Sequence, residues 1–278
     1  MPPRARLVHN ARMSQEEASL AELEGFALEL GRIAGSIARA HFRRPLTVEN
    51  KNETGFDPVT SADRAIESVL RKAILERWPD HGIVAEEEGV HAGTSPFTWF
   101  VDPIDGTRSF MMGSPLWGAL IGLTKEGKPL FGVLCQPILG EVFLGAPAGS
   151  WLIREESRER LHARRCTKLA DCTLACTHPD MFHGASAAAF ATLAKACLLD
   201  RFGGDCYNYA MLAAGFVDLV VEAGLHSYDI VPLIPIIEGA GGVVTDWRGE
   251  SPLQGGSVVA AATPELHRAA LKILQARR

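Results

Sequence analysis

The segment Phe100-Val-Asp-Pro-Ile-Asp-Gly-Thr-Arg-Ser-Phe110 places two carboxylates, Asp102 and Asp105, at the exit of an apolar run. Two carboxylates this close repel each other in a cleft of low dielectric constant, and each is driven toward its neutral form. A hard divalent cation would hold both ionised, since such ions prefer oxygen ligands. Gly106 permits close backbone approach, so the N–H groups of Gly106 and Thr107 can bind phosphate oxygens. The segment therefore predicts half of a metal site.

The composition of the 278-residue chain argues against several classes of protein. A net charge of −5 disfavours binding to nucleic-acid phosphates, and no apolar run approaches the ~20 residues of a membrane-spanning helix. The N-terminus has no apolar stretch behind its basic residues, so it does not resemble a secretory signal. Six cysteines without a CxxC pair are typical of reduced thiols. We therefore expect a cytoplasmic protein that binds neither membranes nor nucleic acid.

Hydrophobic periodicity divides the first half of the chain into helices followed by strands. The capping-box segment Ser14-Gln-Glu-Glu17 predicts the start of a helix of about 28 residues. Thr60 or Ser61 is expected to cap a second helix, which ends before Pro79. Short apolar runs then predict strands at 83–85, 99–101, 116–124, 130–136, 141–146 and 151–154.

After residue 165 the helical and strand patterns alternate. The expected order is strand 173–177, helix 186–197, helix 208–214, strand 217–222, helix 229–240, strand 242–246, strand 257–261 and a helix from residue 264. Helices and strands in layers indicate an α/β or α+β fold with two lobes. We expect a flexible tail at 1–13 and a single domain at 14–278, with an N-terminal α+β lobe (14–160) and a C-terminal α/β lobe (161–278).

Four acidic positions lie at the ends of apolar elements, where α/β proteins gather ligands. They are Asp57 to Asp63 before the second helix, Glu86 to Glu88 after a strand, Asp102 with Asp105, and Asp229 at a helix start. Each has a simpler interpretation alone, because Asp63 and Asp229 suit helix starts and three consecutive glutamates are typical of a solvated loop. Their joint occurrence, followed by Gly106 and Thr107, favours a magnesium site.

Magnesium takes oxygen ligands and is usually completed by substrate phosphate, so two ions would fit these residues. The predicted ligands are Asp102 as a bridge between the ions, Glu86 and the Ile104 carbonyl on one ion, and Asp105 and Asp229 on the other. The Thr107 hydroxyl, hydrogen-bonded to Asp63, would orient and deprotonate the attacking water. This arrangement predicts hydrolysis of a phosphate ester without a covalent enzyme intermediate.

Four segments together resemble the inositol monophosphatase superfamily, from about residue 15 to the end of the chain. They are Asp57-Pro-Val-Thr-Ser-Ala-Asp63, Ile83-Val-Ala-Glu-Glu-Glu88, Trp99 to Phe110, and Ser227-Tyr-Asp229 with Glu238-Gly-Ala-Gly-Gly242. The resemblance implies a layered αβαβα sugar-phosphatase fold, magnesium dependence, lithium sensitivity and dimers. It implies the same metal ligands, a catalytic role for Glu86, and Asp63 with Thr107 as the water-activating pair. Ala85 and Tyr228 replace the usual glycine and tryptophan, and neither change removes a ligand.

Within this superfamily the chain most resembles the bacterial histidinol-phosphatase branch. The resemblance lies in the segments Asp105 to Gly118, Arg201 to Tyr209 and Val220 to Gly242. It implies that Asp205 and Glu222 face the substrate, where their carboxylates would bind the ammonium and imidazole of histidinol phosphate. Asp205 is also a suitable helix cap, and both roles are compatible. Arg108 either joins Gly106 and Thr107 on the phosphate or faces solvent.

The predicted function is Mg²⁺-dependent hydrolysis of L-histidinol phosphate to L-histidinol and phosphate, a step of histidine biosynthesis, by direct attack of a metal-activated water. Two or three Mg²⁺ ions per active site, a small-molecule phosphate monoester as substrate and a homodimer are expected. The alternatives are an inositol-1-monophosphatase, a phosphatase of broad sugar-phosphate specificity and, ranked lower, a nucleotide 3′-phosphatase. A different class also stays open, namely a binding partner of the transcription machinery with secondary catalysis.

Overall fold

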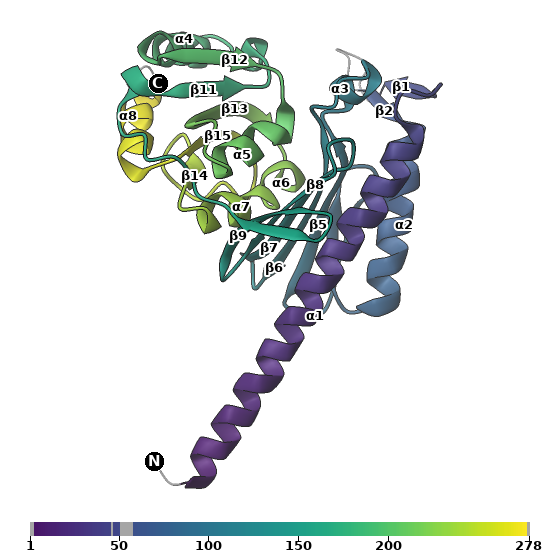
Figure 1. The fold of residues 1–278 in the computed structure, drawn as a ribbon. Coiled ribbons are helices and arrows are strands. Elements are labelled where there is room, and N and C mark those ends of the chain that lie inside the picture. The colour runs from purple at the N-terminus through teal and green to yellow at the C-terminus, as the bar shows by residue number, and fades with distance from the viewer. Residues whose placement is uncertain (1–2, 46, 51–57, 277–278) are drawn as a thin grey trace.

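The computed structural model describes residues 3–45, 47–50 and 58–276, with side chains from residue 19 onward. Within these residues the chain forms a two-stranded, an eight-stranded and a five-stranded sheet (Figure 1). The eight-stranded sheet belongs to the first lobe and the five-stranded sheet to the second. Asp57, one of the predicted helix-entry acids, lies outside the described residues.

Two long helices cover one face of the eight-stranded sheet (Figure 1). Helix α1 (Pro3–His41) begins before the predicted capping box, so residues 3–13 continue this helix; the flexibility expected of residues 1–13 stays a prediction. Helix α2 (Ser61–Arg77) begins after Thr60, as expected. Its capping box is reciprocal, because the Thr60 side chain accepts from the Ala62 N–H and Asp63 accepts from the Thr60 N–H at 2.8 Å.

The eight-stranded sheet has the order β10-β9-β8-β7-β6-β5-β3-β4, and among these strands only β3 and β5 pair in parallel. Its strands are β3 (Gly82–Ala85), β4 (Gly89–His91), β5 (Phe97–Asp105), β6 (Gly118–Lys125), β7 (Lys128–Gln136), β8 (Glu141–Ala146), β9 (Gly149–Arg154) and β10 (Ser157–Arg160). The small sheet pairs β1 (Val48–Asn50) with β2 (Pro58–Thr60). Strands β4 and β10 were not predicted, because neither contains a fully buried residue that would mark it in the sequence.

The second lobe places helices on both faces of a five-stranded sheet of order β12-β11-β13-β15-β14. Its strands are β11 (Thr173–Cys176), β12 (Leu199–Phe202), β13 (Leu219–Leu225), β14 (Val243–Asp246) and β15 (Gly256–Ala261). Its helices are α4 (Ala185–Ala196), α5 (Asp205–Ala213), α6 (Ser227–Ile230), α7 (Leu233–Gly239) and α8 (Pro264–Gln275). Two short 3₁₀ turns, η1 (Leu169–Asp171) and η2 (Pro179–Met181), complete the lobe, and α3 (Thr107–Met111) follows β5.

Three expectations for the second lobe were wrong in detail. The helix predicted at 229–240 is two helices, α6 and α7, because Pro232 between them supplies no N–H to a continuous helix. Helix α5 begins at Asp205, three positions before the predicted start. Strand β12 was missed because all four of its residues are exposed, which leaves no apolar alternation to read.

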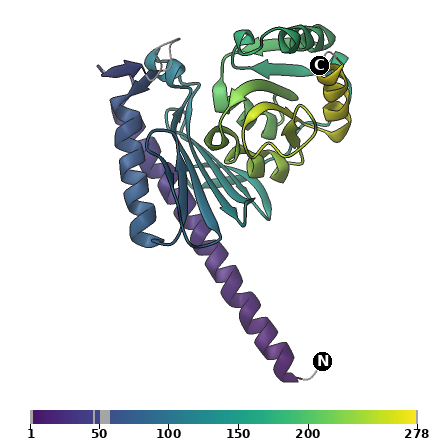
Figure 2. The same cartoon turned by 180° about the vertical axis from the view of Figure 1, so that it is seen from behind.

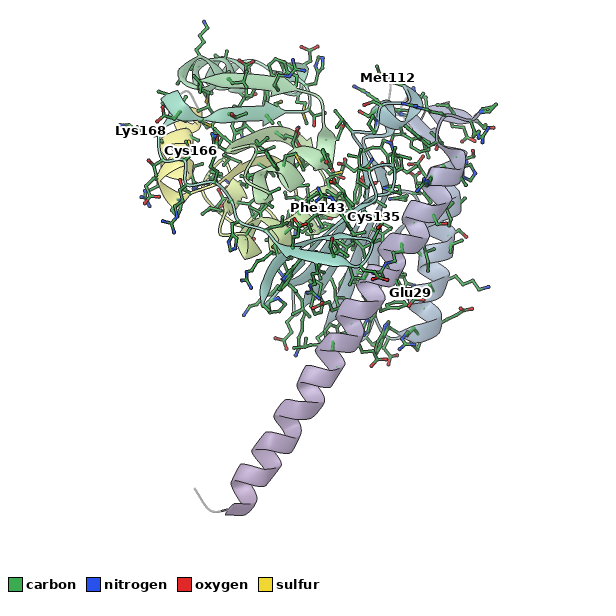
Figure 3. All side chains as sticks on the ribbon, viewed as in Figure 1. Glu29, Met112, Cys135, Phe143, Cys166 and Lys168 are labelled. Atoms are coloured by element: carbon green, nitrogen blue, oxygen red, sulfur yellow. The ribbon has the colours of Figure 1, made fainter. Side chains whose placement is uncertain are left out.

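Three hydrophobic cores alternate with the sheets and produce five layers. The first core lies between the eight-stranded sheet and helices α1 and α2. The second contains residues of the eight-stranded sheet, of α5 and α7, and of the five-stranded sheet. The third lies between the five-stranded sheet and helices α4 and α8. Cys135 of β7 and Phe143 of β8 belong to the first and second core respectively, on opposite faces of one sheet (Figure 3). The layers are therefore αβαβα, as predicted, and the view from behind shows the two sheets side by side (Figure 2). None of the described helices is long and apolar enough to cross a bilayer.

A row of glycines lets the second lobe approach the eight-stranded sheet closely. Gly122, Gly132 and Gly145 are in register across β6, β7 and β8. A Cβ atom at Gly132 would lie 1.8 Å from the Pro232 carbonyl oxygen, and one at Gly145 would lie 2.2 Å from the Ile236 nitrogen. The backbone that joins α6 to α7 therefore rests directly on the sheet, and this contact sets the position of the preceding α6.

Candidate active site

A cavity of about 460 Å³ opens where β3, β5, β11 and the starts of α3, α5 and α6 meet. It is lined by Glu86, Asp102, Ile104, Asp105, Gly106, Thr107, Arg108, Asp205 and Asp229, which are all the residues predicted for the site except Asp63 and Glu222. The predicted ligands come from three elements that are distant in sequence. The fold thus brings together the residues that the sequence indicated.

A bulge in β5 places Asp102 and Asp105 on the same side of the strand. Side chains three positions apart in a regular strand point to opposite faces. Asp102 pairs with Leu120 and Asp105 with Gly118, so β5 holds one residue more than β6 across this interval. The extra residue restores a common face, and Pro103 lies inside the interruption, where a missing N–H is tolerated.

The carboxylates of the cavity raise one another's pKa values. The pKa of Asp102 lies well above its usual range, first because the side chain is buried and then because Glu86, Asp105 and Asp229 are close. Burial also raises the pKa of Asp105, followed by repulsion from Asp205 and Asp229. The Cys206 N–H donates to Asp105 at 2.5 Å. The Cys206 side chain partly opposes the rise in the Asp105 pKa by hydrogen bonding to the carboxylate. Without a cation, the site therefore disfavours the ionised carboxylates.

The donor set fits a divalent cation with oxygen ligands. Carboxylate oxygens of Asp102, Asp105 and Asp229 lie within 4.8 Å of one another, and so do those of Asp63, Glu86 and Glu87. Oδ1 of Asp63 is buried and has no hydrogen-bond partner among the residues that the structure describes. A buried carboxylate oxygen without a donor is costly unless a cation or an ordered water approaches it. Since both of these groups, within the described residues, consist of carboxylates, magnesium fits better than zinc.

The turn after β5 has the geometry expected for a phosphate site. Gly106 adopts φ 91°, a left-handed conformation that favours glycine, and precedes α3. The Thr107 hydroxyl donates to the Ile104 carbonyl at 3.0 Å. A Cβ atom at position 106 would lie 3.0 Å from Oδ2 of Asp205. This carboxylate therefore borders the same turn that would hold the phosphate.

The predicted hydrogen bond between Thr107 and Asp63 is not formed between these two described residues. Oδ2 of Asp63 instead accepts from the Thr60 N–H and from the Thr60 hydroxyl at 2.5 Å, because Asp63 occupies the third position of α2 and completes its cap. Burial raises the pKa of Asp63 to about 6, against the opposing effect of the Thr60 hydrogen bonds. Asp63 thus lies beside Glu86, with Oδ2 held by Thr60 and Oδ1 without a donor in residues 3–45, 47–50 and 58–276.

Asp205 and Glu222 occupy different positions relative to the cavity. Asp205 lines it as the first residue of α5, has φ 44°, and accepts from the Ser109 hydroxyl at 3.0 Å. Glu222 lies beneath the cavity, 2% exposed, and accepts from the Thr177 N–H at 3.0 Å and the Tyr209 hydroxyl at 3.1 Å. Burial raises the pKa of Glu222 to about 7. In this arrangement Glu222 supports Thr177, which does line the cavity.

Sequence reasoning missed several residues at the site. His178, Met181 and His226 line the cavity, and the rings of His226 and Tyr228 stack with centroids 5.1 Å apart. Neither histidine is among the predicted site residues. His226 lies within the segment Val220 to Gly242, whose resemblance to the histidinol-phosphatase branch was the available signal. His178 follows β11, and only the fold brings it to Asp205.

Comparisons with known proteins identify the family that this chain resembles. The model of the inositol monophosphatase family matches residues 19–278. The bifunctional phosphatase IMPL2, chloroplastic, of Arabidopsis thaliana is 37% identical over 94% of this chain and 78% of its own length. A histidinol-phosphatase of Chlorobaculum parvum is 34% identical over 84% of this chain and 90% of its own. The structure of an inositol monophosphatase from Zymomonas mobilis superposes with a TM-score of 0.81 at 35% identity, over 92% of this chain and 98% of that one.

Proposed function

The chain belongs to the inositol monophosphatase family, and on this premise we propose that it is a Mg²⁺-dependent phosphatase that hydrolyses L-histidinol phosphate to L-histidinol and phosphate. One observation carries the choice of substrate. The Asp205 carboxylate lines the cavity and borders the turn at Gly106 that would hold the phosphate. A substrate that bears a cation close to its phosphate ester would meet both groups at once.

In this proposal the metal would be held by the oxygen donors already described, namely Glu86, Asp102, the Ile104 carbonyl, Asp105 and Asp229. When bound, Mg²⁺ supplies positive charge to the transferred phosphoryl group and makes water a stronger nucleophile. The N–H groups of Gly106 and Thr107 bind phosphate oxygens, with Arg108 at the same rim. The site residues thereby position the phosphorus atom for attack by water.

Asp63 is suited to accept the proton of the attacking water. Its Oδ1 is buried and accepts no hydrogen bond from the described part of the chain, and a carboxylate oxygen of Asp63 lies within 4.8 Å of one of Glu86. With a pKa of about 6, the Asp63 carboxyl is ionised at neutral pH. This pKa is also close to that of an efficient general base. The Thr60 hydrogen bonds hold its other oxygen, so the side chain needs no rearrangement before it takes the proton.

The charge of the cavity favours a cationic leaving alcohol. Asp205 would repel a phosphate ester that has no positive group, and it would pair with the ammonium or imidazole of histidinol phosphate. Glu222 is buried and accepts hydrogen bonds from Thr177, so it would act through Thr177 rather than by direct contact with the substrate. Tyr228 and His226 add an aromatic wall on which an imidazole ring can stack.

The test is the ratio of kcat/KM for L-histidinol phosphate to that for inositol-1-phosphate, in wild type, Asp205→Asn and Asp171→Asn. Asp171 is an exposed aspartate on η1 that does not line the cavity, and it serves as the matched control. We expect Asp205→Asn to lower the ratio by about 10- to 100-fold, as for the loss of a charge-assisted hydrogen bond, and Asp171→Asn to leave it unchanged. A wild type that prefers inositol-1-phosphate, or an unchanged ratio in Asp205→Asn, would contradict the assignment.

The proposal has further parts that go with the substrate. We propose a role in histidine biosynthesis, two or three Mg²⁺ ions per site, a cytoplasmic location and a homodimer. Exposed apolar side chains on the edge strand β12, Leu199 and Phe202, support association with a second copy. Inositol-1-phosphatase or broad sugar-phosphate activity is the alternative, which the same ratio tests. Stoichiometric capture of RNA polymerase, unaffected by Asp102→Asn, would favour the transcription-partner alternative.

A further inference from the structure

A buried carboxylate on α2 holds the turn that carries the Glu86 ligand. Glu67 has no exposed surface, and its two oxygens accept from the N–H groups of Glu87 and Glu88, each at 2.7 Å. The turn formed by residues 86–88 joins β3 to β4. Glu67 therefore binds the backbone of this turn, whose first residue, Glu86, lines the cavity.

An arginine one helical turn along α2 completes the arrangement. Nε of Arg71 donates to Glu67 at 3.0 Å, and its guanidinium also donates to the Gly89 carbonyl. The Arg71 side chain lies 3.5 Å from the Glu88 carboxylate as well. Arg71 places a positive charge beside the Glu67 carboxylate, whose two oxygens both act as acceptors, and it attaches the far end of the turn to the same helix.

The turn needs such support because it is highly charged. It contains three consecutive glutamates, whose mutual repulsion favours an open, solvated conformation. A carboxylate that accepts two adjacent backbone N–H groups fixes the orientation of the peptide units between them. Groups that orient a ligand in this way contribute to metal affinity although they do not touch the ion.

We propose that Glu67 is a positioning residue for metal binding, which orients Glu86 by fixing the backbone of the 86–88 turn, with Arg71 as its counter-ion. The inference rests on the proposed function only in that the cavity binds Mg²⁺. It does not depend on which phosphate ester is the substrate.

The decisive variant is Glu67→Gln, which has nearly the same shape. A glutamine has one acceptor oxygen and one NH₂ group, so one of the two backbone N–H groups or Arg71 would face a donor. The matched control is Glu76→Gln on the same helix, where an exposed glutamate lies 3.8 Å from Lys72. Both variants remove one negative charge from α2 and differ in whether they contact the turn.

The readouts are the Mg²⁺ dissociation constant from calorimetry and the unfolding midpoint in EDTA. We expect Glu67→Gln to weaken Mg²⁺ binding by about 10- to 100-fold, and Glu76→Gln to bind as the wild type does. With phosphate release as a further readout, the half-saturating Mg²⁺ concentration should rise while kcat at saturating Mg²⁺ stays near the wild-type value. If Glu67→Gln does not fold, Arg71→Lys replaces it, with the same direction expected.

The outcomes separate the two claims. If Glu67→Gln folds and binds Mg²⁺ as tightly as the wild type does, only the positioning role is overturned. If Glu67→Gln is unfolded, the same result in Arg71→Lys has the same meaning. A wild type that binds Mg²⁺ but releases no phosphate overturns the proposed function and leaves the positioning role standing if Glu67→Gln binds more weakly. A wild type that binds no Mg²⁺ overturns both.

Discussion

Asp102 and Asp105 lie three positions apart in one strand, yet their carboxylate oxygens come within 4.8 Å of each other. The bulge between them produces this proximity, because it adds one residue to β5 opposite β6. The two carboxylates therefore repel each other at the place where the proposed function requires a cation. Stability and activity should therefore respond to these residues in opposite directions.

Asp102→Asn should stabilise the metal-free protein and abolish metal-dependent activity. In the fold, burial and neighbouring carboxylates raise the pKa of Asp102 above its unfolded value. The stability that comes with protonation is present below the unfolded pKa and is lost as the pH rises through the folded pKa. At pH 7 in EDTA, removal of the charge should add about 1–3 kcal/mol to the free energy of unfolding. A lower stability of Asp102→Asn in EDTA would contradict this account of the site.

Gly106→Ala should remove phosphate binding. Its φ of 91° costs a non-glycine residue about 1–2 kcal/mol, and the new Cβ would lie 3.0 Å from Oδ2 of Asp205. Gly127 is the control, since its φ is 73° and nothing lies within 4 Å of the corresponding position. Both variants should lose similar stability in urea titrations, while Gly106→Ala alone loses about 100-fold or more in kcat/KM. Equal activities of the two variants would argue against a phosphate site at this turn.

Gly145→Ala should weaken the contact between the lobes. The added Cβ would lie 2.2 Å from the backbone of α7, which cannot move without displacing α6 and Asp229. We expect a loss of about 3 kcal/mol in the free energy of unfolding, at the upper end of overpacking effects. Gly25→Ala in α1 has open space around it and should instead stabilise by about 0.5–1 kcal/mol. Denaturant unfolding measures both, and a neutral Gly145→Ala would show that the sheet tolerates a side chain there.

His81 should make stability depend on pH. Its Nδ1 accepts from the Trp99 indole N–H at 3.0 Å, and burial lowers the pKa of the ring. In the unfolded chain the His81 ring binds a proton near pH 6.5, whereas in the folded protein it does so at a lower pH. The free energy of unfolding therefore falls as the pH drops from about 6.5 toward the folded pKa. His81→Asn removes the titration. Between pH 7 and pH 5 the free energy of unfolding of the wild type should therefore fall more than that of His81→Asn. A difference between the two proteins that does not change with pH would contradict this prediction.

Local signals in the sequence were sufficient for the fold class and for most of the candidate site. Thr60 and Asp63 satisfy a capping rule within four residues, and the predicted ligands Glu86, Asp102 and Asp229 each follow or open an apolar element. The αβαβα order came from the family resemblance, and the structure confirms it. Such features need no knowledge of long-range contacts.

The features that escaped prediction depend on residues that meet only in three dimensions. The role of Gly145 becomes visible when α7 is seen against β8, and that of Glu67 when α2 is seen against the 86–88 turn. Thr107 was expected to pair with Asp63, but its hydroxyl donates to the Ile104 carbonyl, and Thr60 binds Oδ2 of Asp63. In each case the sequence shows a residue type suited to several partners, and packing selects one of them.

Phosphate release from L-histidinol phosphate, measured with Mg²⁺ and with EDTA for wild type and Asp102→Asn, tests the central claim most directly. The account predicts rapid release by the wild type with Mg²⁺, none above background in EDTA, and none by Asp102→Asn under either condition. Release that persists in EDTA or in Asp102→Asn would contradict a metal site built on the two carboxylates of β5.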